Sequence, residues 1–173
     1  MRRNSQKLWK IVSVGIRNQP PQLKYTGESP NYDKNIITIP SSFITWLREI
    51  FKEENFEKAL TLSIAHELQH HLQALGGNCW IDWQLNLTSG DTKAEAEAEA
   101  DYKGIISTYL LGYNDMAAFF EEFMKKIYAK YNISDKPDGY PHLVERKQFA
   151  EKVVQQAKQD WIHFEVAKLV PSD

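Results

Sequence analysis

The chain has 173 residues, of which 42% are hydrophobic and 25% are charged, enough for one globular domain with a sizeable core. Its net charge of −2 and pI near 6.2 argue against nucleic acid or an anionic membrane as a partner. No apolar run approaches the roughly 20 residues of a membrane span, and the run at residues 11–16 is too short for a signal-peptide core. A single cysteine, Cys79, excludes an internal disulfide. We expect a soluble, cytoplasmic protein, and the sequence leaves its oligomeric state open.

After an N-terminal extension, residues 1–24, the pattern predicts short strands at residues 22–25 and 35–40. β-branched residues favour the second strand, and Pro40 ends it. We expect the strands to form a small antiparallel sheet.

Five helices are predicted along the rest of the chain. The strongest covers residues 55–77 and is rich in Ala and Leu, with Asn55 as a plausible N-cap. Gly76 and Gly77 stand where the end of a helix favours a left-handed residue. The other helices are predicted at residues 41–51, about 92–111, about 115–131 and about 144–168, before a tail at residues 169–173. The chain therefore reads as one mostly helical α+β domain, residues 1–173.

The strongest helix contains the segment HELQH, with His66, Glu67 and His70. Histidines four residues apart lie on the same helical face, so both can reach one metal ion. Glu67 is rotated by about 100° from His66, which places it beside the metal, where it could hold and deprotonate a water molecule. A chance match on a surface helix is the alternative, disfavoured because the chain has only five histidines. His71 and His163 are interpreted as histidines without a metal role, His71 on the helix surface.

A catalytic zinc site takes three protein ligands and leaves the fourth position to water. No third histidine follows the helix at a ligand spacing. Cys79, on the loop behind it, is interpreted as a small buried hydrophobe. A carboxylate is therefore the expected third ligand.

The segment AEAEAEAD offers three glutamates for this role, and a helix separates them onto two faces. At 100° per residue, Asp101 falls about 40° from Glu97. Small residues such as Gly104 surround this pair and would let another helix approach. Glu95 and Glu99 share the opposite face, which looks solvated. The helical wheel thus selects Glu97 as the third ligand and Asp101 as a group that orients a ligand histidine. In the alternative, all three glutamates are solvated.

HELQH followed by EAEAD resembles the HExxH and ExxAD motifs of the gluzincin metallopeptidases of the HtpX and CAAX-prenyl-endopeptidase family. Three further stretches resemble this family in the same order: NIITIPSSFITWL, GYNDMAAFFEEFMKK and YPHLVERKQFAEKV. The resemblance covers roughly residues 25–155. The membrane-spanning helices of larger members are missing, so the chain is most similar to the soluble minigluzincins.

This resemblance implies a zincin-like fold in which one zinc ion per chain is bound by His66, His70 and Glu97. Glu67 would be the general base of peptide hydrolysis, and Asp101 would support the site.

The resemblance also implies that the substrate, a peptide or protein, lies extended along one strand and pairs with it as an added strand. The residues concerned are Ile36, Ile37, Thr38 and Ile39. The family's late HPxxxER segment carries a histidine that stabilises the oxyanion and an arginine nearby. Aligned on Arg146, that histidine is replaced by Tyr140, with His142 two positions on, so either could take the role or pack in the loop. Arg146 would either support the site or lie on a helix surface.

The sequence therefore predicts a zinc-dependent endopeptidase. Two alternatives are a regulatory metallopeptidase of the ImmA/IrrE type that acts on a repressor, and a non-catalytic, zinc-stabilised binding module.

Overall fold

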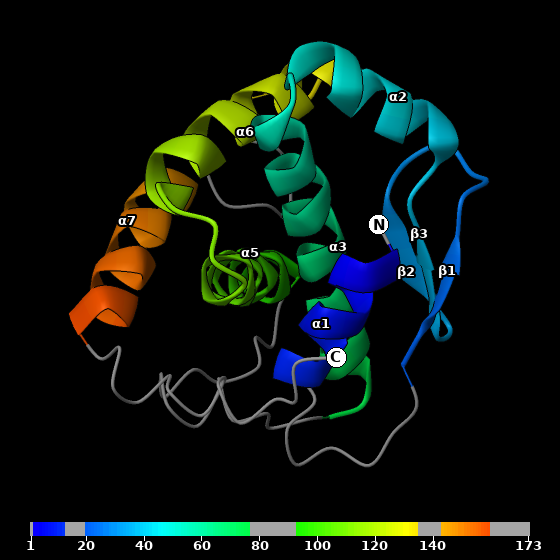
Figure 1. Ribbon diagram of the computed structural model, residues 1–173, viewed down its shortest axis with the longest axis horizontal. Helices are drawn as coiled ribbons and strands as arrows, with labels where there is room; N and C mark the ends of the chain where they lie inside the picture. Colours follow the sequence, from blue (N-terminus) through cyan, green and yellow to red (C-terminus); the bar gives the residue numbers. More distant parts are fainter. Residues whose placement is uncertain (1, 13–19, 77–92, 135–142, 160–173) are drawn as a thin grey trace.

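The computed structural model describes residues 2–12, 20–76, 93–134 and 143–159, which contain a small sheet and mostly helical structure (Figure 1). The strands are β1 (Gln22–Lys24), β2 (Asn31–Asp33) and β3 (Ile36–Thr38). The helices are α1 (Arg2–Val12), α2 (Ser41–Ile50), α3 (Glu54–Ala74), α5 (Lys93–Leu110), α6 (Met116–Tyr131) and α7 (Leu143–Gln159). Within these ranges, no helix has the length and apolar character needed to cross a membrane.

The sheet is mixed rather than antiparallel, so the prediction for its pairing is wrong. Its strand order is β1-β3-β2, with β3 parallel to β1 and antiparallel to β2. Lys34 and Asn35 both have positive φ and form the tight turn that folds β3 back beside β2. β2 was not predicted because its three residues include two polar ones and no β-branched one.

Because β3 is central, the expectation of a substrate strand at residues 36–39 is also wrong. The backbone of Ile36–Thr38 pairs with β1 on one side and β2 on the other, and the amide of Ile39 donates to the carbonyl of Lys24 at 2.8 Å. An extended peptide therefore has no free edge there. Among the described residues, β1 and β2 form the edges of the sheet.

The N-terminal extension contains α1, a helix that the sequence pattern did not predict. Leu8 is fully buried, and the Trp9 ring packs on His71 of α3 with ring centroids 5.6 Å apart. Through this contact, α1 packs against α3 (Figure 1).

Helix α3 runs through the middle of the molecule beside α5, which Figure 1 shows end-on. It begins at Glu54, so Asn55 lies in its first turn and is not its N-cap. Gly76 follows the helix with a left-handed φ of 65°, as predicted, whereas Gly77 lies outside the described residues. Phe43 of α2 and the α6 residues Phe119 and Phe120 belong to the same core cluster as the buried side chains of α3.

Candidate metal centre

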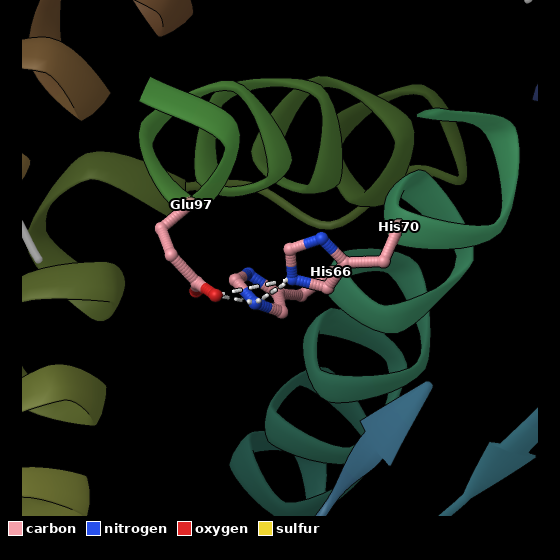
Figure 2. Close-up of side chains that lie close together, drawn as sticks. All are labelled: His66, His70 and Glu97. Carbon is pink, nitrogen blue, oxygen red and sulfur yellow. Dashed lines mark hydrogen bonds and ion pairs between the residues drawn. The ribbon is translucent and has the colours of Figure 1, made fainter. Parts of the chain in front are cut away.

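His66 and His70 on α3 converge with Glu97 on α5 (Figure 2). The two Nε2 atoms are 3.1 Å apart, and the Glu97 carboxylate oxygens lie 3.3 Å from His66 Nε2 and 3.6 Å from His70 Nε2. The three side chains are between 15% and 20% exposed, so solvent reaches the cluster. In the part of the chain that the structure describes, they form a group that could hold a metal ion.

A close approach of α5 to α3 brings these side chains together. Gly104 faces the backbone of His66, and a Cβ atom added to it would lie 3.3 Å from the His66 amide nitrogen. A larger residue would force the two helices apart. Glu97 and Gly104 are seven positions apart, two helical turns, so the residue that permits the approach and the candidate ligand share a face.

A chain of buried polar groups holds the ring of His66 from behind. Its Nδ1 lies 3.0 Å from Asp101 Oδ1, and Arg146 Nε donates to the other oxygen of Asp101. Arg146 Nη1 also donates to the Tyr128 hydroxyl at 3.1 Å. Because Nδ1 donates to Asp101, Nε2 is the ring nitrogen that faces Glu97 and His70, and it would offer its lone pair to a metal ion once its proton is lost. Arg146 is 5% exposed, lines the same cavity as the cluster and has its Nη2 atom 4.0 Å from Glu97 Oε2, so it does not lie on a helix surface.

Hydrogen bonds within the cluster decide the direction of the pKa shifts of His66 and Glu97. Burial lowers the pKa of His66, but hydrogen bonds with Asp101 and Glu97 outweigh it and raise this pKa from 6.5 to about 10. Burial raises the pKa of Glu97, but its hydrogen bonds with His66 and His70 prevail and hold this pKa far below the ordinary value. Without a metal ion, the cluster is therefore an imidazolium held by carboxylates.

We expect metal affinity to rise with pH up to about 10, because the metal-free fold keeps His66 protonated below that pKa. A metal ion must replace the proton on His66, so each binding event should release about one proton and the affinity should rise about tenfold per pH unit. The raised pKa stabilises the metal-free fold fully below 6.5, and this contribution disappears as pH rises to about 10. Calorimetry in buffers of different ionisation enthalpy measures the released protons. An affinity that does not change with pH would contradict the coupling.

Glu67 lies next to the cluster but is not one of its three donors. It is 7% exposed and lines a cavity together with His66 and Glu97. Burial raises the pKa of Glu67, the charges of His66 and His70 oppose this rise, and the charge of Glu97 adds to it; the net direction is upward. Such a carboxylate accepts a proton more readily than an exposed one.

The cavity has a volume of about 280 Å³ and is lined by both polar and apolar residues. His66, Glu67 and Glu97 are among the polar ones. The apolar ones include Phe43, Leu62, Phe120, Phe123, Met124 and Ile127. The candidate metal centre therefore shares its cavity with several large apolar side chains.

Two predictions about exposure are wrong. His71, expected on the helix surface, is 1% exposed, and its Nδ1 lies 3.2 Å from the Tyr32 hydroxyl. The elements that cover it, α1 and β2, were both missing from the sequence prediction. Glu99, expected on a solvated face, is 4% exposed and accepts hydrogen bonds from Lys103 and Gln73.

Several candidates cannot be compared with the structure. Tyr140, His142, Cys79 and His163 lie outside the described residues, as does the side chain of Glu95. The sequence reasoning in turn missed Gln73, Lys103 and Tyr128. Gln73 stands three residues after His70, and Lys103 four after Glu99, both spacings of helical neighbours that could have been noticed.

Comparison with known proteins gave no match to a family model, to a curated protein or to a solved structure.

Proposed function

We propose that the protein is a zinc-dependent endopeptidase in which His66, His70 and Glu97 bind the metal and Glu67 is the general base. One observation carries the proposal: three donor groups converge next to a buried carboxylate that lines the same cavity. The resemblance of HELQH and EAEAD to gluzincin motifs, with the zincin-like fold that it implies, points to the same chemistry.

The donor set suits zinc in type and in spacing. Zinc binds imidazole nitrogen and carboxylate oxygen at about 2.0–2.2 Å, so tetrahedral geometry separates two donors by about 3.3–3.6 Å. The separations of 3.1, 3.3 and 3.6 Å between donor atoms are close to this range. A bound zinc ion would lower the pKa of a coordinated water towards about 7.

Glu67 would take the proton of the attacking water and deliver it to the leaving amine. Its burial supports this role, because a desolvated carboxylate with a raised pKa holds the proton long enough to pass it on. Asp101, held by Arg146, would keep the His66 ring in the orientation in which Nε2 faces the other two ligands. Stabilisation of the oxyanion stays assigned to Tyr140 or His142 through the resemblance alone.

We further infer that an extended substrate pairs with β2 in place of β3. Ser29 and Pro30, directly before β2, line the cavity next to Glu67, and Asn31 and Asp33 of β2 are exposed. The outer edge of β2 thus leads an added strand towards the candidate metal centre.

The apolar residues that line the cavity support a preference for a large apolar side chain next to the scissile bond. Its volume of about 280 Å³ is just below the about 300–1,000 Å³ of small-molecule pockets, a size suited to a side chain.

Ile127→Trp would fill the cavity from α6, where Ile127 is half-buried. We expect it to slow cleavage next to large apolar residues at least about tenfold relative to cleavage next to small ones. A peptide library with sequencing of the products measures this ratio. The control is Ile50→Trp, at an exposed position of α2 outside the cavity lining. Equal preferences in the two variants would contradict the assignment of the cavity.

The two alternative functions make different predictions. A regulatory ImmA/IrrE-type enzyme would share the three ligands but would cut a repressor and not peptides in general. A zinc-stabilised binding module would keep its metal and show no hydrolysis. Peptide cleavage that stops with a chelator and returns with zinc supports the endopeptidase, whereas a zinc-loaded chain that cleaves no library peptide contradicts it.

A further inference from the structure

A second series of polar groups contacts His70 through its Nδ1 atom and ends at the buried pair Glu99 and Lys103. His70 Nδ1 lies 2.9 Å from Gln73 Oε1. The amide nitrogen of Gln73 donates to Glu99 Oε2 at 2.7 Å and to the carbonyl of Ala96 at 2.9 Å. Lys103 Nζ donates to the other oxygen of Glu99. These contacts connect α3 to α5 behind the candidate metal centre.

The contacts of Gln73 fix which way its amide points. Glu99 and the carbonyl of Ala96 are acceptors, so they require the NH₂ group, which leaves the amide oxygen for His70. An oxygen opposite His70 Nδ1 requires a proton on that nitrogen. The neutral ring then carries its lone pair on Nε2, the atom 3.6 Å from the Glu97 carboxylate.

Glu99 and Lys103 make this arrangement rigid. They are 4% and 3% exposed, so each charge has left water and depends on its partner. Moving the Glu99 carboxylate away from Lys103 would leave two buried charges without a partner, which costs free energy. The Glu99 carboxylate therefore gives the amide of Gln73 an acceptor in a fixed position, which a solvated glutamate would not provide.

We propose that Gln73, anchored by the Glu99–Lys103 pair, is a positioning residue for His70. This inference rests on the proposed metal centre. It gives each histidine its own support: Asp101 with Arg146 for His66, and Gln73 with Glu99 and Lys103 for His70. The group next to His70 Nδ1 is a neutral amide, whereas the group next to His66 Nδ1 is a carboxylate. The two histidines therefore differ in basicity as ligands.

The test measures binding of the metal alone. Gln73→Met keeps the length of the side chain and removes the acceptor, and we expect zinc affinity, measured by chelator competition, to fall about 10–100-fold. The absorption spectrum of bound cobalt(II) should change as well, because the ring of His70 is no longer fixed. Gln155→Met, at an exposed position of α7, is the matched control and should leave both readouts unchanged. Thermal unfolding of the metal-free variants shows whether each one folds.

If Gln73→Met does not fold, Gln73→Asn takes its place, because its amide is shorter by one methylene and should not reach His70.

The outcomes separate this inference from the proposed function. Wild-type affinity and an unchanged cobalt spectrum in Gln73→Met would overturn the positioning role and leave the peptidase proposal standing. A wild-type chain that binds zinc without cleaving peptides would sink the peptidase proposal, while weakened binding in Gln73→Met would still support the positioning role. A wild-type chain that binds no metal would overturn both.

Discussion

Glu67→Gln is expected to slow peptide cleavage by about 10²–10⁴-fold, the usual contribution of general acid–base catalysis. Glutamine has the shape of glutamate but cannot take the proton of the attacking water. Glu67 is not among the three converging donors, so the variant should bind metal like the wild type. Its fold should persist, because the substitution removes a charge from a buried site where that charge is costly.

The measurement is cleavage of a responsive library peptide together with metal content. Glu57→Gln is the matched control, since Glu57 is exposed on the same helix, and it should cleave at the wild-type rate. If Glu67→Gln also cleaves at that rate, Glu67 is not the general base. If it loses its metal, Glu67 is a ligand and the assignment of Glu97 needs revision.

Glu97→Ala is expected to have the largest effect on metal binding. It removes one of three donors and the only carboxylate among them. The loss of affinity should therefore exceed the about 10–100-fold that supporting residues contribute. Cleavage should stop at zinc concentrations that saturate the wild type. Alanine is a strong helix former, so α5 should remain intact.

The same variant has a second readout in the metal-free protein. Glu97 is one of the two carboxylates whose hydrogen bonds raise the pKa of His66. Without it, this pKa should move from about 10 towards 6.5, which NMR titration of the ring can follow. Glu151→Ala, at an exposed position of α7, is the control for both readouts. Full metal loading and activity in Glu97→Ala would rule out Glu97 as a ligand.

The sequence predicted the members of the cluster because helical geometry is regular. A spacing of four residues places His66 and His70 on one face without knowledge of the fold. The same helical geometry places Glu97 on a different face from Glu95 and Glu99, although the glutamates repeat every two residues in the sequence. The structure brings Glu97 and the two histidines together.

The errors come from contacts between segments distant in the chain. The burial of His71 depends on Trp9 of α1 and Tyr32 of β2, which contact it from segments much earlier in the chain. Glu99 is buried because Gln73 reaches it from another helix and Lys103 pairs with it. β3 looked like an accessible strand because nothing local to residues 35–40 reveals two pairing partners. Arg146 donates its Nε–H to Asp101 from another helix, a contact that no local pattern reveals.

The contact of Gly104 with the backbone of His66 also has a consequence for which ion can be accommodated. Two helices in contact leave little freedom to spread the donor atoms. Calcium, with bonds of about 2.3–2.6 Å and six to eight oxygen ligands, needs a wider and more numerous set than two imidazoles and one carboxylate. Discrimination against abundant hard cations would thus begin with the distance between two helical backbones, before ligand chemistry contributes. A methyl group at position 104 would meet the backbone of His66 and so act on the position of a candidate donor residue without replacing it.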